Sequence, residues 1–292
     1  MALVLAGAAA LAALGGTWIA YRAAGVFRAQ YADFRPPRET FPAPAAPLAD
    51  LTLRLGSGTV VKGWTLPSAN GAAVVFVHGS PGDRRALLET ARALHGAGYG
   101  AVLIDVPGHG ESAGRATWDA ETLEAVRAAL DAAAKGPQVR RLALVGYSMG
   151  SNIAARVAAA EPGVGAVVLL APFTDLAEQL RYQYRHRIPG LSEAAVLATR
   201  IAGVPVAQMR TTESVAALRG RALMIIAGDL DAAIPAAMPR ALFAAAGEPK
   251  VLWVVKGAGH ADARRIAGPV EFDGRIRDFL DASLLGPGRG AR

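Results

Sequence analysis

Short apolar runs alternate with longer amphipathic segments between residues 50 and 285. Runs such as Ala73–His78 are apolar at consecutive positions, which is typical of strands that are covered on both faces. The expected strands cover 51–55, 59–66, 73–78, 100–105, 142–146, 166–171, 222–228 and 251–256, and the expected helices cover 84–97, 117–134, 148–160, 235–246 and 269–285. This alternation predicts an α/β domain with a mostly parallel, eight-stranded sheet and helices on both faces.

One stretch interrupts the alternation. Residues 172–220 show no clear strand pattern, so we expect a small lid insertion that lies over the carboxyl edge of the sheet and roofs a pocket. This stretch contains the basic and aromatic run Arg181–Arg187. Two interpretations of the run stay open: a solvated helix face, or a surface that meets anionic lipid headgroups or a carboxylate on the substrate.

The first residues form a separate element. Ala2–Tyr21 carry no charged side chain. A helix of this length spans about 30 Å, which matches the hydrocarbon core of a bilayer. A cleaved signal peptide and a buried core helix are the rival interpretations, but the start lacks a basic residue and no small-x-small cleavage site follows the run. We therefore expect residues 1–24 to be a single transmembrane anchor.

The residues that follow the expected anchor favour one orientation. Four arginines lie within residues 22–38, and the positive-inside rule then places the rest of the chain in the cytoplasm.

Residues 25–49 are expected to be a linker, because five prolines fall between positions 36 and 47. The folded domain should cover 50–285, and the glycine-rich tail 286–292 is expected to be disordered.

Composition excludes several kinds of site. The chain has no cysteine, which excludes disulfides, thiolate catalysis and cysteine-based metal sites. Its net charge is +7, but the basic residues are scattered and no nucleic-acid-binding module is present. We expect no cofactor and no nucleic-acid partner.

The pentapeptide Gly146–Gly150 reads Gly-Tyr-Ser-Met-Gly, a G-x-S-x-G motif that follows one expected strand and opens an expected helix. A strand that turns into a helix within two residues needs small neighbours and leaves Ser148 strained and projecting at the helix N-terminus. Backbone N–H groups there favour developing negative charge. The motif predicts that Ser148 is a nucleophile.

Two backbone amides are expected to form an oxyanion hole. One belongs to Met149, the residue after the nucleophile. The other is expected in the loop His78-Gly-Ser-Pro-Gly82, at Ser80, because Pro81 has no N–H to donate.

A histidine and an acid complete the expected set. His260 follows the last strand in the run Gly-Ala-Gly-His, where the glycines allow its loop to bend back over the sheet edge. The acid that orients it should be Asp231, with Asp229 and Asp175 as alternatives. The order serine, aspartate, histidine is the one found in hydrolases of this architecture.

These motifs, together with Asp-Val-Pro-Gly-His-Gly-Glu-Ser at 105–112, resemble the α/β-hydrolase superfamily. The segment Ala171–Thr174, the insertion and the expected anchor are similar to the membrane-anchored Bem46-like group, which is related to serine aminopeptidases and monoacylglycerol-lipase-like enzymes. The group's oxyanion loop more often reads His-Gly-Asn, so this chain departs from it there. That group's Gly-x-x-Asp-x-x-x-Pro pattern favours Asp231.

The residues together predict a serine hydrolase of a small-molecule or lipid ester. An ester or thioester carbonyl would be attacked by Ser148, and water activated by His260 would release the acid. Amide hydrolysis of the aminopeptidase type, and acyl transfer or another non-hydrolytic use of the same residues, are the alternatives. A binding protein on the same fold is a further one, which the complete set of three residues argues against.

Overall fold

The computed structural model describes residues 44–185 and 190–286, together with Gly15, Trp18, Tyr21 and Phe41. Most of the expected anchor (1–24), most of the linker and all of the tail beyond Gly286 lie outside these described residues. No helix in the described part of the chain is long and apolar enough to cross a membrane.

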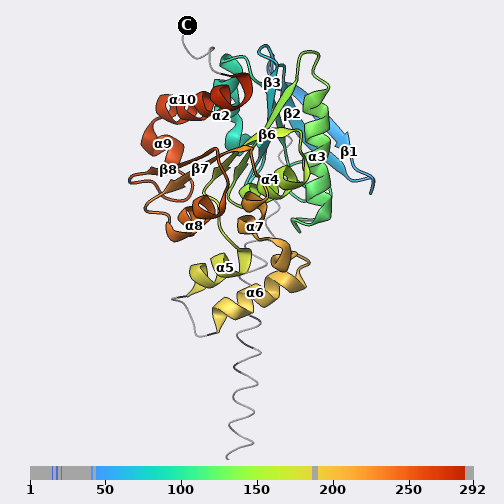
Figure 1. Cartoon of the computed structure of the whole chain (residues 1–292). Coiled ribbons are helices and arrows are strands. Elements are labelled where there is room, and N and C mark those ends of the chain that lie inside the picture. Colours follow the sequence, from blue (N-terminus) through green and yellow to red (C-terminus); the bar gives the residue numbers. More distant parts are fainter. Residues whose placement is uncertain are drawn as a thin grey trace, which may run out of the picture.

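The core of the fold is one eight-stranded sheet in the order β1-β2-β4-β3-β5-β6-β7-β8 (Figure 1). The first two pairings, β1 with β2 and β2 with β4, are antiparallel, and all others are parallel. The predicted mostly parallel sheet is therefore confirmed. The strands are β1 (Ala49–Arg54), β2 (Val60–Leu66), β3 (Ala72–Val77), β4 (Gly100–Ile104), β5 (Arg141–Tyr147), β6 (Val164–Leu170), β7 (Ala222–Gly228) and β8 (Lys250–Val255).

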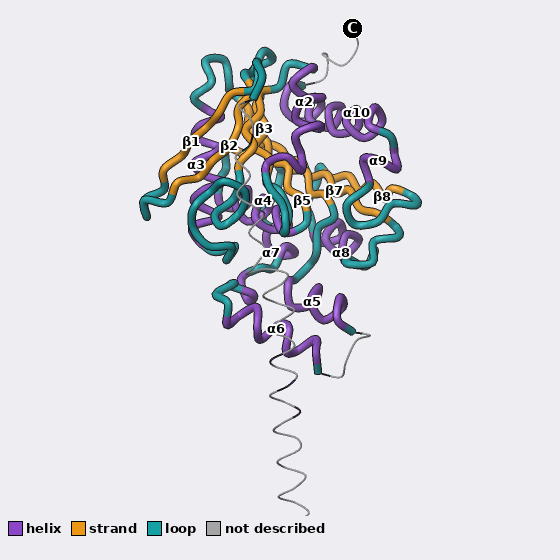
Figure 2. The backbone as a smooth tube through the Cα atoms, turned by 180° about the vertical axis from the view of Figure 1, so that it is seen from behind, coloured by secondary structure: helices purple, strands orange, loops and turns teal. Residues whose placement is uncertain are grey.

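Helices cover both faces of the sheet, as predicted (Figures 1 and 2). On one face, α2 (Leu88–Gly96) and α10 (Pro269–Leu280) pack side by side and close one apolar cluster. On the other, α3 (Ala120–Ala134), α4 (Met149–Ala160) and α8 (Ala237–Ala245) close a second cluster. Every residue of β3, β4 and β7 is buried, which explains their continuous apolar sequences.

The strand register brings the expected site loops together. Val77 at the end of β3 lies opposite Gly146 near the end of β5, so the loop after β3 meets the turn after β5. Gly228 at the end of β7 lies opposite Val255 at the end of β8. Parallel strands place all four loops at one edge of the sheet, where sites of open α/β folds form.

The described part of the insertion is mostly helical. It contains α5 (Leu176–Tyr184), α6 (Leu191–Ile201), the 3₁₀ turn η3 (Val206–Gln208) and α7 (Thr211–Ala216). Both views show α5 and α6 standing off one end of the sheet (Figures 1 and 2). Arg181 of the basic run donates to Glu193 over 2.6 Å, so this arginine ties α5 to α6.

Several expected helices differ at their boundaries. The helix expected at 84–97 begins as a 3₁₀ turn, η2 (Arg84–Leu87), before α2. The helix expected at 117–134 begins at Ala120, because the side chain of Asp119 accepts from the Glu121 amide and caps it there. The last helix ends in a π turn, η4 (Asp281–Leu285), after α10, and α9 (Ala263–Ala267) is an additional short helix.

Candidate active site

Ser148 occupies the turn between β5 and α4. Its backbone has φ 52°, a conformation that a non-glycine residue adopts only when its surroundings enforce it. The Ser148 amide donates to Leu170 O over 2.9 Å, and its carbonyl accepts from the Ser151 amide. The helix begins at Met149 rather than at Ser148 because of this conformation.

Close backbone packing explains why this turn needs glycine. A Cβ at Gly150 would lie 2.2 Å from the carbonyl oxygen of Val77, and one at Gly146 would lie 2.4 Å from that of Gly150. Neither backbone oxygen can move away cheaply, so any larger residue would push α4 off the sheet. The two glycines therefore fix Ser148 against the end of β3.

His260 joins Ser148 to Asp231 through a continuous chain of hydrogen bonds. The distance from His260 Nε2 to Ser148 Oγ is 3.0 Å, and from His260 Nδ1 to Asp231 Oδ2 it is 2.8 Å. Asp231 and Ser148 are buried, while the imidazole remains partly exposed. A carboxylate can only accept from Nδ1–H, so Nε2 is left free to take the proton of the serine hydroxyl.

Of the three candidate acids, Asp231 is the one whose carboxylate bonds the imidazole. Its Oδ1 also accepts from the amides of Ala233 and Ile234, at 2.9 and 2.8 Å, which fixes the carboxylate. Asp229 instead accepts from the Gly257 amide over 2.6 Å and ties the ends of β7 and β8 together. Asp175 caps α5.

The insertion reaches this loop directly. Gln179 of α5 is buried, and its side-chain amide donates to the carbonyl of Ala233 over 3.3 Å. A movement of α5 would therefore displace the Ala233 carbonyl, which lies two residues along the chain from Asp231.

The loop after β3 packs against the serine turn. A Cβ at Gly79 would lie 3.1 Å from the Ser148 Cβ and 3.0 Å from the Tyr147 carbonyl. The absence of a side chain at Gly79 thus allows the Gly79–Ser80 peptide to approach Ser148 closely.

His78 orients that peptide. Its Nε2 accepts from the Val106 amide over 3.1 Å, so Nδ1 carries the proton and donates to the Gly79 carbonyl over 2.7 Å. In a planar trans peptide the N–H points opposite to the C=O, so the Ser80 amide is directed away from His78. Burial lowers the pKa of His78 to about 4, which keeps the ring neutral.

A second buried histidine lies against the same loop. His109 Nε2 is 3.5 Å from Ser80 Oγ, and its Nδ1 donates to the Pro107 carbonyl over 3.2 Å. Burial is the main reason that the pKa of His109 is lowered to about 3. The rings of His78, His109 and Trp118 pack together behind the loop.

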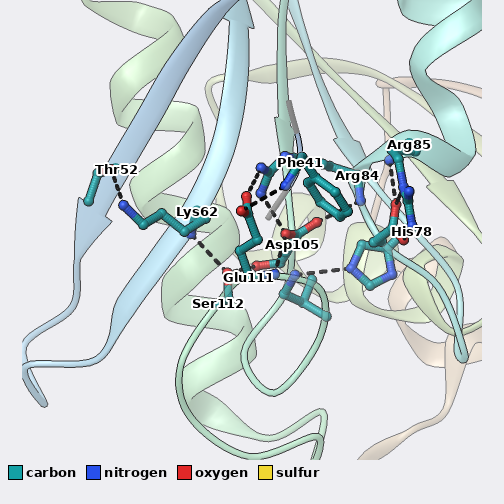
Figure 3. Close-up of polar contacts among 11 residues, drawn as sticks. Phe41, Thr52, Lys62, His78, Arg84, Arg85, Asp105, Glu111 and Ser112 are labelled. Carbon is teal, nitrogen blue, oxygen red and sulfur yellow. Dashed lines mark hydrogen bonds and ion pairs between the residues drawn. The ribbon is translucent and has the colours of Figure 1, made fainter. Parts of the chain in front are cut away.

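A buried charged network joins η2 to the loop that follows β4 (Figure 3). The guanidinium of Arg84 donates to Asp105 over 2.6 Å and also bonds Glu111. The rings of Phe41 and Trp64 lie 4.4 and 4.5 Å from its central carbon. Sequence reasoning assigned no role to Arg84, and nothing in its local sequence separates it from a surface arginine.

Tyr147 links the nucleophile turn to the histidine loop. Its hydroxyl donates to the His260 carbonyl over 3.2 Å, and the two rings are 5.5 Å apart. Burial raises the pKa of the Tyr147 phenol, so the hydroxyl stays protonated and remains a donor.

The five residues expected from the sequence lie at this one edge of the sheet. The arrangement offers a hydroxyl, a base in contact with it and an acid that holds the base, which is the constellation used for nucleophilic acyl transfer. In the part of the chain that the structure describes, no group of histidine, aspartate and glutamate side chains is arranged to hold a metal ion.

Comparisons with known sequences give a consistent result. Residues 68–217 match the model of the family described as serine aminopeptidase, S33. The uncharacterized protein Rv2307c of Mycobacterium tuberculosis is 33% identical over 242 residues, which cover 81% of each chain. The uncharacterized protein YfhR of Salmonella typhimurium is 26% identical over 87% of this chain and 86% of its own.

Solved structures share the fold. The Pyrococcus furiosus esterase Pf2001 superposes with a TM-score of 0.70 at 18% identity, over 86% of this chain and 97% of its own. An esterase from Exiguobacterium antarcticum superposes with a TM-score of 0.61 at 15% identity, over 78% and 98%. At these identities the likeness establishes the architecture, which is that of the α/β-hydrolases.

Proposed function

This chain belongs to the serine aminopeptidase S33 family of α/β-hydrolases, and from that premise we propose that it cleaves carboxylic esters through an acyl-enzyme formed on Ser148. The observation that carries the proposal is the pair of hydrogen bonds through His260, 3.0 Å to Ser148 and 2.8 Å to Asp231. Ester rather than amide cleavage is favoured by the similar structures that are named as esterases.

The proposed reaction has two halves. In the first, Ser148 Oγ attacks the ester carbonyl while its proton moves to His260 Nε2, and the same proton then passes to the alcohol oxygen as the ester C–O bond breaks. In the second, His260 takes a proton from water, the water oxygen attacks the acyl carbon, and the proton returns to Ser148 as the acid leaves. Asp231 holds the imidazole in the tautomer that both halves require.

Two amides would stabilise the oxyanion of each tetrahedral intermediate. The proposed donors are the N–H groups of Ser80 and Met149. Support comes from the close contact of Gly79 with Ser148 and from the His78 hydrogen bond that turns the Ser80 amide away from His78. The N-terminus of α4 adds a favourable dipole.

The test is hydrolysis of p-nitrophenyl esters of acetate, butyrate, octanoate and palmitate, beside an aminoacyl p-nitroanilide. The parent should release p-nitrophenol from at least one ester and bind a fluorophosphonate covalently, and the Ser148→Ala variant should do neither. Amide turnover without ester turnover would favour the aminopeptidase function that the family's description names. A folded parent that turns over neither substrate would favour acyl transfer to an acceptor other than water.

We also propose that residues 1–24 anchor the chain in a membrane with the catalytic domain in the cytoplasm. The support is the uncharged run from Ala2 to Tyr21 and the arginines that follow it. The full-length chain should resist carbonate extraction, and the double variant Leu11→Arg/Leu14→Arg should be released, because each central arginine costs about 2.5–3.5 kcal/mol on insertion. The intact mass of the membrane-bound chain separates an anchor from a cleaved signal peptide.

A further inference from the structure

A cavity that is partly open to solvent lies beside the imidazole of His260. Its walls come from three places in the fold: the turn η2 with α2, the ends of β5 to β7, and the histidine loop with α9 and α10.

The position of the cavity relative to Ser148 identifies which part of a substrate could enter it. Tyr147 and His260 both line it, so it borders the nucleophile turn on the side of the base. Of the described residues that form its wall, none is Ser148 or one of the proposed oxyanion donors, Ser80 and Met149.

During ester cleavage, different groups of the substrate face the oxyanion donors and His260. The carbonyl oxygen of the substrate must point toward the oxyanion donors. The leaving oxygen must come within hydrogen-bond reach of His260 Nε2, which returns the proton as the C–O bond breaks. The group attached to the leaving oxygen is therefore directed to the His260 side.

The lining of the cavity indicates the chemistry of its occupant. Apolar side chains form most of the wall, among them Leu87, Leu170, Ile226 and Phe272. The polar side chains of Thr90 and Arg264 in the wall are already paired with Asp273, because Thr90 donates to its carboxylate over 2.9 Å and Arg264 bonds both of its oxygens. These side chains therefore need no hydrogen bond from a ligand. An apolar group would enter the cavity without giving up hydrogen bonds to water that the wall cannot replace.

We propose that this cavity binds the leaving group of the ester and accepts the apolar alkyl or aryl portion of an alcohol. The inference rests on the proposed ester hydrolysis at Ser148. The leaving group would then contact the wall formed by η2, α2 and α9 rather than the insertion.

The two halves of the reaction allow a direct test. The leaving group is present only until the acyl-enzyme forms, so a variant that narrows the cavity should change acylation and leave deacylation of the shared acyl-enzyme unchanged. Ala86 lies exposed at the wall of the cavity on η2, and Ala86→Phe is the narrowing variant. The matched control is Ala93→Phe, which places the same ring on an exposed position of α2 outside the cavity.

Methyl, butyl and benzyl butyrate share one acyl group and differ in the alcohol. We expect Ala86→Phe to lower kcat/KM for benzyl butyrate, relative to methyl butyrate, by at least about tenfold. The deacylation rate constant of the butyryl-enzyme, measured from the phase after the burst with p-nitrophenyl butyrate, should stay within about twofold. Ala93→Phe should change neither quantity.

The other outcomes overturn the inference in separate ways. A slower deacylation or a shifted acyl-chain preference in Ala86→Phe would place the acyl group in the cavity instead. Unchanged discrimination in both Ala86→Phe and a second filling variant, Ala263→Leu on α9, would place the cavity outside the substrate's path. A folded parent that forms no acyl-enzyme at all would contradict the proposed function itself, and the inference with it.

Discussion

Arg84 and Asp105 form two hydrogen bonds with each other in the interior of the protein. The Arg84 backbone amide donates to Asp105 Oδ1 over 2.7 Å, and its guanidinium donates to Oδ2 over 2.6 Å. Both side chains are almost completely buried. A buried charge costs several kcal/mol unless it is paired, so each residue depends on the other.

Removing one partner should therefore unfold the protein more easily. We expect Arg84→Met to lower the free energy of unfolding by about 3–5 kcal/mol, because the Asp105 carboxylate is left buried without its cation. Urea denaturation followed by circular dichroism measures this change. The exposed pair Arg92–Glu89 provides the control, since Arg92→Met should cost no more than about 1 kcal/mol. Equal costs at the two sites would contradict this account of the network.

The fold and most of the candidate site were predictable from the sequence, for a physical reason. A strand covered on both faces needs an unbroken apolar run, and a serine turn packed against β3 needs glycine at fixed positions, so both leave local patterns. Arg84 leaves no such pattern. Its partners Asp105, Glu111 and Phe41 are distant in the sequence, and only the folded chain brings them together.

The choice between two acids shows the same limit on a smaller scale. Asp229 and Asp231 both follow β7, and the sequence alone leaves either able to reach a histidine. The contact of Asp229 with the Gly257 amide depends on the pairing of β7 with β8. The geometry of the loop, rather than the type of residue, separates them.

These two acids give a sharp prediction for catalysis. Asp231→Asn should lower kcat by about 10³–10⁴-fold, because an amide can donate to Nδ1 and so hold the imidazole in the wrong tautomer. Asp229→Asn should leave kcat within about tenfold of the parent, since the Asp229 carboxylate bonds the Gly257 amide while the imidazole bonds Asp231. Steady-state ester hydrolysis measures both. A larger loss in Asp229→Asn than in Asp231→Asn would assign the acid to the other residue.

The buried histidines should make stability depend on pH. The pKa of His78 is about 4 and that of His109 about 3 in the folded protein, so between these values and pH 6.5 the unfolded chain binds protons that the folded chain does not. The free energy of unfolding therefore falls as pH falls below 6.5, by at most about 1.4 kcal/mol per pH unit for each histidine. Asp105 acts in the opposite sense, because burial raises its pKa to about 6 and the folded chain binds the extra proton.

A substitution isolates the part due to one ring. In His78→Asn the slope of unfolding free energy against pH should be smaller by about 1.2 kcal/mol per pH unit between about pH 5 and about pH 6. Urea denaturation at the two pH values measures the slope in parent and variant. A slope equal to that of the parent would mean that His78 binds its proton in the folded state as readily as in the unfolded chain.

His78 should also affect turnover without affecting substrate binding. Because its Nδ1–H holds the Gly79 carbonyl, His78→Ala frees the Gly79–Ser80 peptide to rotate and misdirects the Ser80 amide. Loss of one oxyanion donor lowers kcat by about 10²–10³-fold. A donor that is still present but misdirected should lower kcat by up to about 10²-fold, with little change in KM. His78→Asn, which keeps a side-chain donor, should recover part of the loss.

Ser80→Ala is the control, since it removes the hydroxyl that faces His109 but keeps the backbone N–H. If Ser80→Ala lowered kcat as much as His78→Ala, the donor would be the Ser80 hydroxyl, and the orientation of the peptide would not be the quantity that His78 controls.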